Sequence, residues 1–334
     1  MKHEELKIVV IGGGSSYTPE IAEGLIRRKD RMKVRELALV DIDSGKEKMT
    51  VIEEMIGRMF RSASMETKLS SSTEPEEALK DCDFIICQIR AGGLRSRMLD
   101  EQIPLKYGLI GQETTGVGGL FNGLRSVPQV IALAKLAERI CPDAWFINFA
   151  NPAGMVAEAI LKETRVKAVG LCNVPINMTA DIAAQLQVKR EEIYVRYFGL
   201  NHLSWVTGVR HRGKEVLPAL LDSRESRQLL SNVPQVQGAE AFIKKLGAIP
   251  SPYLTFLRNL AVSGPVFFII LEATVAGVAT TAFFAKTIFS PPADFMTILT
   301  LEPSSMTDVT SEPVIISGFA LDEKAEIRSL LPPE

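Results

Sequence analysis

One segment, VVIGGGSSYTPEI from Val9 to Ile21, constrains the fold of this chain more than any other. A β-branched run leads into three glycines and two serines, and apolar residues at helical spacing follow, which predicts a strand, a tight turn and a helix. Glycines in such a turn let the backbone approach a diphosphate, and the helix N-terminus favours an anion. The candidate cofactor-binding residues of the turn are Gly12, Gly13, Gly14, Ser15 and Ser16. The match to G-x-G-x-x-G is partial, because Tyr17 takes the place of the third glycine.

An acidic residue after the next apolar run supports the same interpretation. The run Glu36–Val40 predicts a second strand, and Asp41 follows it directly. A carboxylate at this position of a dinucleotide-binding fold accepts hydrogen bonds from ribose hydroxyls and disfavours a 2′-phosphate, so the pattern predicts NAD rather than NADP. The alternative, that Asp41 only begins a loop, is less favoured because the glycine turn is already in place.

Length and composition limit the classes of protein to which the chain can belong. Its 334 residues are sufficient for two domains, and 46 % of them are apolar. A formal net charge of -2, from 38 basic and 40 acidic residues, argues against a nucleic-acid-binding or polybasic membrane surface. None of the four cysteines forms a C-x-x-C pair, so their spacing suggests neither a zinc ribbon nor a disulfide framework. No signal peptide precedes the first strand, and we expect a cytoplasmic protein.

Predicted strands and helices alternate from Asp41 to the middle of the chain. The predicted helices are Lys46–Arg61, Pro75–Lys80, Arg125–Cys141 and Met155–Glu163. The predicted apolar strands are Asp83–Gln88, Trp145–Phe149 and Lys167–Leu171. This order predicts an α/β fold with a Rossmann-like doubly wound parallel sheet. The later strands Tyr194–Leu200, Ser204–Val209 and Glu215–Leu217 look antiparallel, which predicts a smaller α+β domain after the sheet.

Polar residues lie where these predicted strands end, the edge at which open α/β sheets bind ligands. Arg97 belongs to a charge cluster after one strand, which is either a solvated helix face or a substrate contact. Asn151 directly follows another strand and precedes a proline, so its amide is expected at the sheet edge. The glycine-rich stretch Gly108–Gly119 is predicted to be an irregular loop that presents one carboxylate, Glu113.

Two potential metal ligands also follow predicted strands. Cys172 comes after the strand Lys167–Leu171, and His202 comes after the strand Tyr194–Leu200. Thiolate and imidazole both bind divalent metals, so the pair is a candidate metal site. A lone histidine is more often an ordinary hydrogen-bonded side chain, and that alternative stays open at this point.

Several of these strings together resemble glycoside hydrolase family 4, the NAD- and metal-dependent glycosidases, and within it the 6-phospho-β-glucosidase branch. The matching strings, in family order, are IGGGSSYTPE, DEQIPLKYGLIGQETTGVGG, NFANPAGM, GLCNVPIN, GLNHLSW and PSPYL. The resemblance implies a lactate/malate-dehydrogenase-like fold, bound NAD, a divalent ion (usually manganese) and a sugar-6-phosphate glycoside as substrate. It also implies a homo-oligomer, a dimer or tetramer, and no membrane partner.

The resemblance also implies roles for individual residues. Cys172 and His202 look like the metal ligands, and Arg97 and Asn151 look like contacts to the sugar. Tyr253 is the best match for a catalytic tyrosine, and Glu113 looks like the carboxylate that raises its basicity. Asn173 stands where α-specific members have an acidic aspartate, and because an amide cannot donate that proton, the β-specific branch is favoured.

The implied chemistry is a redox elimination with no net oxidation. NAD takes a hydride from C3 of the sugar, and the resulting ketone acidifies the proton at C2 while the metal polarises the neighbouring oxygens. A tyrosinate removes that proton, the glycosidic oxygen leaves, water adds and the hydride returns. Ordinary glycosidases instead use two carboxylates, and this family is an exception to that rule.

The last part of the chain departs from the family pattern after Leu254. The stretch Leu260–Phe289 is almost continuously apolar, but glycine, proline, threonine and two charged residues interrupt it, which disfavours a membrane helix. We interpret residues 259–334 as an atypical tail, the product of a truncated or frame-shifted reading. We expect an NAD-binding domain over residues 1–171 and an incomplete metal and substrate domain over residues 172–258.

Two other functions are compatible with these residues. One is a catalytically impaired remnant of the family that still binds NAD, which the tail favours. The other is an NAD-dependent 2-hydroxy-acid dehydrogenase on the same fold. A dehydrogenase of that kind needs a histidine base and no metal cysteine, so Cys172 together with His202 argues against it.

Overall fold

The computed structural model describes residues 5–109, 111–222, 239–253, 315–316 and 319–320. The chain divides into two compact units, one formed by Met1–Asp100 and Gly119–Leu171, the other by Glu101–Gly118 and Cys172–Glu334. The apolar run Leu260–Phe289 and almost all of the expected tail lie outside the described residues. Within the described residues, no helix has the length and apolar character needed to cross a membrane. The domain limits expected from the sequence stay a prediction.

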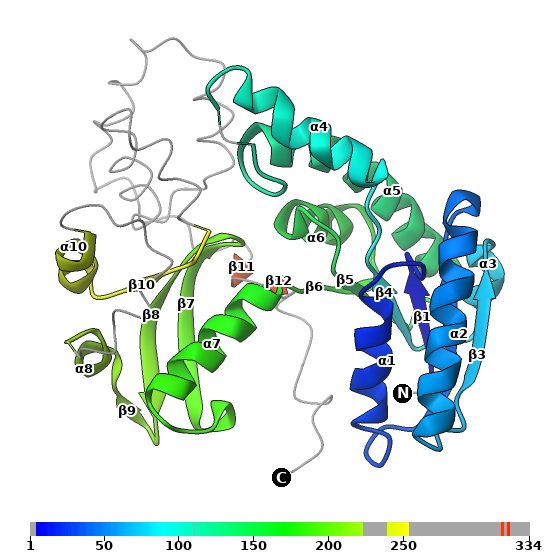
Figure 1. Cartoon of the computed structure of the whole chain (residues 1–334), viewed down its shortest axis with the longest axis horizontal. Coiled ribbons are helices and arrows are strands. Elements are labelled where there is room, and N and C mark those ends of the chain that lie inside the picture. The colour runs from blue at the N-terminus through cyan, green and yellow to red at the C-terminus, as the bar shows by residue number, and fades with distance from the viewer. Residues whose placement is uncertain (1–4, 110, 223–238, 254–314, 317–318, 321–334) are drawn as a thin grey trace. The chain divides into compact units, whose positions relative to one another are not determined.

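The first unit is built on a six-stranded parallel sheet (Figure 1). Its strands are β1 (Leu6–Ile11), β2 (Val34–Val40), β3 (Lys68–Ser72), β4 (Phe84–Cys87), β5 (Trp145–Asn148) and β6 (Lys167–Gly170). The spatial order β3-β2-β1-β4-β5-β6 reverses direction between β1 and β4, which is the switch point where doubly wound folds bind dinucleotides. The predicted Rossmann-like sheet is therefore confirmed.

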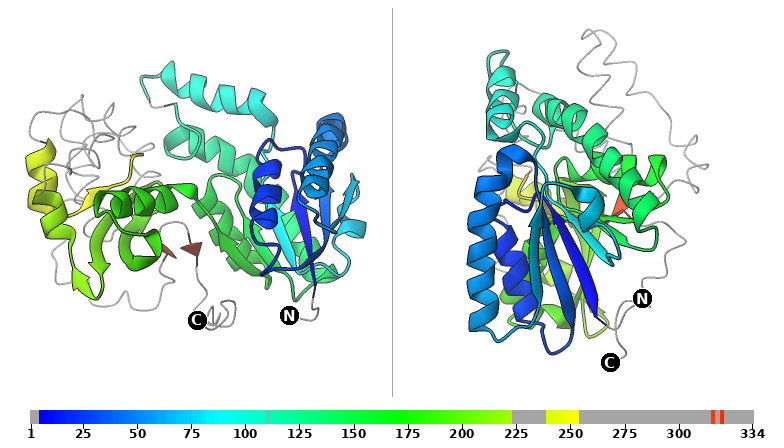
Figure 2. Two further views of the ribbon diagram at one scale, coloured as in Figure 1. Left: turned by 60° about the horizontal axis from the view of Figure 1, so that its bottom comes forward. Right: turned by 90° about the vertical axis from the view of Figure 1, so that its right-hand side faces the viewer.

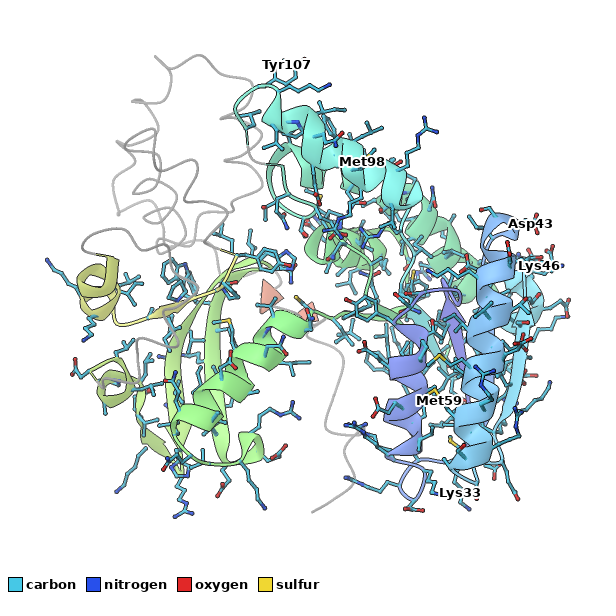
Figure 3. The ribbon with its side chains drawn as sticks, viewed as in Figure 1. Lys33, Asp43, Lys46, Met59, Met98 and Tyr107 are labelled. Atoms are coloured by element: carbon cyan, nitrogen blue, oxygen red, sulfur yellow. The ribbon has the colours of Figure 1, made fainter. Side chains whose placement is uncertain are left out.

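Alternation along β1 explains why helices cover both faces of this sheet. Ile8 and Val10 pack with helices α1 (Thr18–Ile26) and α2 (Lys46–Ser62), whereas Val9 and Ile11 pack with the cluster on the opposite face. The opposite face is covered by α3 (Pro75–Ala78), α5 (Gly116–Ile140) and α6 (Ala153–Glu163). Figure 2 shows strands between these two layers, and Figure 3 labels Met59, which packs against the α1–α2 side.

The second unit contains an antiparallel sheet with helices packed on it. Its strands are β7 (Ile193–Leu200), β8 (Leu203–His211), β9 (Lys214–Glu215) and β10 (Ile249–Pro250). Buried side chains from α7 (Asn173–Gln185), α8 (Leu217–Asp222) and α10 (Ala239–Leu246) form its core together with β8. A short pair, β11 (Ile315–Ile316) and β12 (Phe319–Ala320), is also antiparallel. The predicted smaller α+β domain after the parallel sheet is confirmed.

Several local expectations differ from the structure. Gly116–Gly119 were expected in an irregular loop, but they form the first turn of α5. The strand β3 and the helix α7 were not foreseen. The sequence of β3, KLSSS, lies at the edge of the sheet and lacks the apolar run of a central strand, so no pattern marked it. A 3₁₀ turn, Asp43–Gly45, leads into α2, and α4 (Gly93–Leu105) carries the charge cluster that follows β4.

We expect Phe146→Ala to destabilise the first unit by about 3–5 kcal/mol, because the ring is removed from the centre of a packed core. Phe146 lies on β5, is 0 % exposed and contributes to the cluster under α5 and α6. The matched control is Val51→Ala on α2, where the side chain is 60 % exposed and the change should stay within about 0.5 kcal/mol. Urea unfolding measures both, and a loss below about 1 kcal/mol for Phe146→Ala would contradict this packing.

Candidate active site

The glycine turn lies where β1 ends, next to the first residues after β4. Gly12 has a φ of +87°, and a Cβ there would lie 3.1 Å from the backbone of Gln88. A Cβ on Gly13 would lie 2.8 Å from the Cβ of Leu39. Glycine is therefore required at Gly12 by its left-handed backbone and the nearby Gln88 backbone, and at Gly13 by the closeness of Leu39 on β2. The third candidate, Gly14, follows in the same turn.

Asp41 fastens this turn to the end of β2. Its Oδ2 accepts a hydrogen bond from the Gly14 amide at 2.8 Å, and its Oδ1 accepts one from the Ile42 amide at 2.9 Å. Each carboxylate oxygen has a second acceptor position, so the half-buried side chain can also accept hydrogen bonds from ribose hydroxyls. Asp41 thus shapes the turn through contacts that the sequence did not predict, and its role toward a ribose stays a prediction.

Gln88, a residue that sequence reasoning missed, holds the turn from the β4 side. Its Nε2 donates to the Gly12 carbonyl at 3.2 Å and to the Thr18 hydroxyl at 2.7 Å. The Thr18 hydroxyl itself donates to the Gly13 carbonyl at 2.9 Å, which fixes the orientation of the Gln88 amide. Among the described residues the buried Oε1 of Gln88 has no hydrogen-bond partner. An unsatisfied acceptor beside a glycine turn at the switch point fits a ligand with amide or hydroxyl donors, as NAD has.

Some amides at the start of α1 are already hydrogen-bonded within the protein. The amides of Thr18 and Glu20 donate to carbonyls within the turn, at 3.0 Å each, so they do not face outward. Ser15 is half-buried and Ser16 is exposed, and both carry hydroxyls just before α1. The backbone of Ser16 forms no hydrogen bond among the residues described, so its amide and the two hydroxyls are the groups available to a diphosphate.

The two expected sugar contacts lie near other strand ends of the first unit. Asn151 is half-buried beyond β5, in a turn shaped by the buried Asn148, whose amide exchanges hydrogen bonds with Ala150 at 3.0 and 3.2 Å. Arg97 is half-buried on α4. Arg125 on α5 forms a two-pronged ion pair with Asp100, also on α4, with a 2.8 Å contact to Oδ1, and this pair ties the two helices together.

Glu113 lies in the short loop just before α5, in the second unit. The buried Gln112 shapes this loop, because its Oε1 accepts hydrogen bonds from the amides of Thr114 and Thr115 at 2.6 Å each. This contact resembles an N-terminal helix cap in function, since it satisfies amides ahead of the first helical turn. Glu113 itself is half-buried.

Cys172 and His202, the two metal ligands expected from the sequence, lie in contact in the second unit. Cys172 occupies the N-cap position of α7, and His202 lies in the turn between β7 and β8. The Cys172 Sγ lies 3.5 Å from the His202 Nε2. A divalent ion lies about 2.3 Å from a thiolate sulfur and about 2.1 Å from an imidazole nitrogen. When the angle at the metal is between a right angle and a tetrahedral angle, these two ligand atoms lie about 3.1–3.6 Å apart, so the pair fits a shared divalent ion. No group of three or more His, Cys, Asp or Glu side chains suited to a metal occurs among the described residues.

The environment of His202 keeps its ring neutral and oriented. The side chain is only 4 % exposed, and burial lowers the pKa of His202 to about 4. A neutral imidazole has a lone pair to offer a metal at pH 7. The backbone of His202 has a φ of +66°, an unfavourable value for a non-glycine residue that is found preferentially at functional sites.

Tyr253 stacks on the same imidazole. The two rings are parallel within 6°, with centroids 3.7 Å apart. The amide of Tyr253 donates to the Ser251 hydroxyl at 3.4 Å, which helps to hold the segment after β10 in place. Asn173, the first residue of α7, is exposed beside Cys172. The second unit therefore brings together four of the expected residues, and the first unit brings together the glycine turn and Asp41.

Comparisons with known proteins place the chain in a family. The model of the family 4 glycosyl hydrolases matches residues 7–188, and the model of their C-terminal domain matches residues 197–295, past Leu254. A probable 6-phospho-beta-glucosidase of Bacillus subtilis is 45 % identical over 252 residues, which are 74 % of this chain and 57 % of the relative. A 6-phospho-beta-glucosidase of Escherichia coli is 44 % identical over 259 residues, which are 76 % of this chain and 58 % of the relative.

A solved structure is similar as well. It is the 6-phospho-beta glucosidase of Thermotoga maritima with manganese, NAD+ and glucose-6-phosphate, which has a TM-score of 0.68 and 33 % identity over 84 % of this chain and 66 % of that chain. The chain spans a little over half the length of the two curated relatives. Because the family model alone matches more than half of its residues, this chain belongs to family 4 of the glycosyl hydrolases.

Proposed function

We propose that this chain hydrolyses 6-phospho-β-glucosides with the help of bound NAD and a divalent ion, manganese for preference. The observation that carries the proposal is the Cys172 Sγ at 3.5 Å from the His202 Nε2, with the ring of Tyr253 stacked on the same imidazole. A thiol, an imidazole and a phenol in one place supply two metal ligands and a base, which is the set that a redox elimination requires.

In this proposal, separate groups of residues bind NAD, the divalent ion and the sugar. When bound, NAD supplies reversible hydride transfer at C3 of the sugar, and the divalent ion polarises the oxygens at C2 and C3. The turn Gly12–Ser16 and the Asp41 carboxylate hold the diphosphate and the ribose. Cys172 and His202 would hold the ion, and substrate oxygens and water would supply its other ligands. Arg97 and Asn151 orient the sugar.

Tyr253 removes the C2 proton in this proposal. A tyrosine ordinarily has a pKa of about 10, and positive charge nearby favours its ionised form. In this role Glu113 would accept a hydrogen bond from the phenol and so keep the oxygen basic enough to take the proton. Asn173 beside the metal cysteine has no proton to give to a leaving group, which favours β-glucosides over α-glucosides.

The alternatives differ in what these residues must do. A catalytically impaired NAD-binding remnant needs only the first group of residues, the glycine turn with Asp41. A 2-hydroxy-acid dehydrogenase needs a histidine free to act as a base, whereas His202 is buried against Cys172 and Tyr253. That packing argues against the dehydrogenase. We further propose that the protein works in the cytoplasm as a dimer or tetramer.

Turnover in heavy water tests the proposal directly. With a chromogenic 6-phospho-β-glucoside, NAD and manganese present, deuterium should enter C2 of the released sugar phosphate, because Tyr253 returns a solvent-exchanged proton. Tyr253→Phe should reduce turnover by at least about 100-fold, since a lost general base commonly costs 10²–10⁴-fold. Tyr194→Phe, at a position 65 % exposed on β7, is the matched control and should be unaffected.

Two results would overturn the proposal in different ways. Turnover without deuterium at C2 would exclude proton abstraction there and indicate an ordinary acid–base glycosidase. Absence of turnover together with intact NAD binding would favour the remnant.

A further inference from the structure

Two cysteines outside the candidate active site lie in contact at the opposite end of the parallel sheet. Cys82 precedes β4 and Cys141 follows α5, and their sulfur atoms are 3.2 Å apart. Each residue is only 7 % exposed, and both belong to the apolar cluster under α5 and α6. They are 59 residues apart in the chain, so only the tertiary fold brings the two thiols together.

The surroundings of this pair change the pKa values of the two thiols in opposite directions. The Cys82 thiol donates a hydrogen bond to the Cys141 sulfur, which lowers the pKa of Cys141 and raises that of Cys82. The ammonium group of Lys7, a residue only 7 % exposed, also acts to lower the pKa of Cys141. Lys7 is paired with Glu36 at 3.7 Å, so a buried positive charge is held in this region of the sheet. Cationic neighbours are a common feature of reactive thiols, because the thiolate is the nucleophile.

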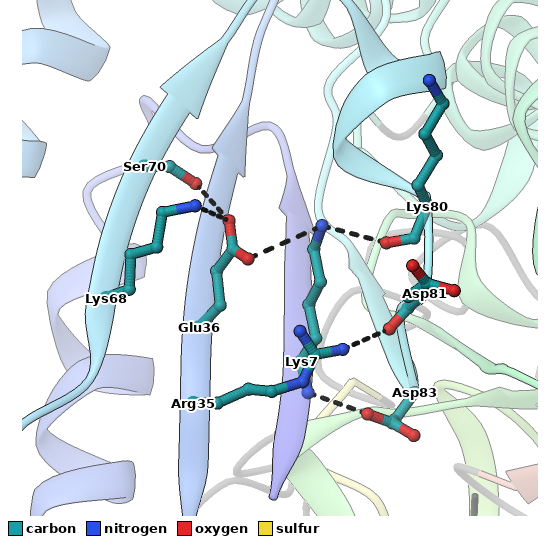
Figure 4. Close-up of polar contacts among 8 residues, drawn as sticks. All are labelled: Lys7, Arg35, Glu36, Lys68, Ser70, Lys80, Asp81 and Asp83. Carbon is teal, nitrogen blue, oxygen red and sulfur yellow. Dashed lines mark hydrogen bonds and ion pairs between the residues drawn. The ribbon is translucent and has the colours of Figure 1, made fainter. Parts of the chain in front are cut away.

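Hydrogen bonds hold the residues on both sides of Cys82, and Figure 4 shows those that involve Lys80, Asp81 and Asp83. The Lys7 Nζ donates to the Lys80 carbonyl at 3.0 Å, and the Lys7 amide donates to the Asp83 carboxylate at 2.8 Å. An Arg35 guanidinium nitrogen donates to the Asp81 carbonyl at 2.7 Å. On the other side, the amide of Cys141 donates to Ala137 at 2.8 Å. Both cysteines are therefore fixed in their segments, with the sulfurs facing each other.

We propose that Cys82 and Cys141 form a redox-sensitive modification site, which a hydroperoxide oxidises to an intramolecular disulfide. The Cys141 thiolate attacks a peroxide oxygen, the O–O bond breaks, and hydroxide leaves as the sulfur becomes a sulfenic acid. The Cys82 sulfur then attacks the Cys141 sulfur, loses its proton, and displaces the sulfenic oxygen as water. In total, the two thiols lose two electrons and two protons, one hydrogen peroxide is reduced, and two water molecules form.

The geometry is close to that of the product. The sulfurs need to approach by roughly 1.2 Å to reach the bond length of about 2.05 Å. The new bond would close a loop that contains β4, α4 and α5, and closing a loop of this length constrains the unfolded chain. Cys87 offers a contrast within the same sheet, because complete burial raises its pKa to about 12 and leaves it unreactive.

The test is oxidation of the full chain with a small excess of hydrogen peroxide, followed by peptide mapping without reduction. We expect one peptide pair joined through Cys82 and Cys141, an intact mass lower by two hydrogen atoms, and full reversal by dithiothreitol. The oxidised protein should melt at a temperature about 5 °C or more above that of the reduced protein. Peptide mapping uses the unsubstituted chain. The proposal can therefore be tested even if a cysteine variant fails to fold.

Variants assign the reaction to this pair. Cys82→Ala and Cys141→Ala should each abolish the internal disulfide, whereas Cys87→Ala, which alters a buried cysteine of the same core, should retain it. The proposal is wrong if Cys82 and Cys141 stay reduced while Cys172 alone oxidises, or if the disulfide joins separate chains. These measurements require neither turnover nor NAD. A failure of the disulfide proposal can therefore be distinguished from a failure of the proposed function.

Discussion

Replacing Cys172 with serine is expected to weaken manganese binding by at least about 100-fold. Replacing a residue that only orients a metal ligand commonly lowers metal affinity 10–100-fold, and this change removes one of the two proposed protein ligands itself. His202→Asn should have a comparable effect, because the neutral ring carries the other proposed ligand atom, 3.5 Å from the Cys172 sulfur. Because only two protein ligands are proposed, tight binding would need substrate oxygens, so manganese is titrated in the presence of glucose-6-phosphate, by calorimetry or by its spin-resonance signal.

The matched control for this metal site is His211→Asn. His211 is the last residue of β8, at the other end of that strand from His202. Its replacement should leave manganese affinity within about twofold. Thermal unfolding without metal shows whether each variant is folded. Unchanged affinity in a folded Cys172→Ser protein would rule out this cysteine as a ligand, whatever the catalytic mechanism.

Gly14→Val is expected to weaken NAD binding by at least about tenfold, or about 1.4 kcal/mol. A Cβ at Gly14 would lie 2.9 Å from the Asp41 Oδ2 and 3.2 Å from the amide nitrogen of Met49. The added side chain therefore displaces the carboxylate that fastens the turn to β2, and it moves the group proposed to accept the ribose hydroxyls. Calorimetric titration with NAD measures the affinity directly.

A second glycine supplies the control for this experiment. Gly24 lies within α1, and a Cβ there has its nearest neighbour, the end of the Arg28 side chain, at an ordinary 3.7 Å. Gly24→Ala should therefore leave NAD affinity unchanged and slightly stabilise the helix. Equal NAD affinity in Gly14→Val and Gly24→Ala would place the cofactor elsewhere. The same pair of variants also shows whether any loss is specific to the turn rather than to α1 as a whole.

The sequence by itself predicted the strand–turn–helix segment with which the parallel sheet of the first unit begins. The run of β-branched residues before Gly12 and the acid after Val40 predict two parallel strands and a turn, because each pattern depends on neighbours within a few residues. The same reasoning located Cys172 and His202 at the ends of strands. Their contact across 30 positions is a property of how α7 and the β7–β8 hairpin pack, and only the structure contains it.

Other features were decided by the tertiary structure alone. The strand β3 carries no apolar run, because an edge strand needs few buried residues, and it forms by pairing with β2. Gly116–Gly119 join α5 in spite of their poor helix propensity, since the helix that follows packs on the sheet and the Gln112 side chain satisfies amides before it. The 3.2 Å contact between Cys82 and Cys141 follows from strand order and not from spacing. Local patterns thus predict elements and their ends, whereas contacts between distant residues depend on burial and pairing that no short segment encodes.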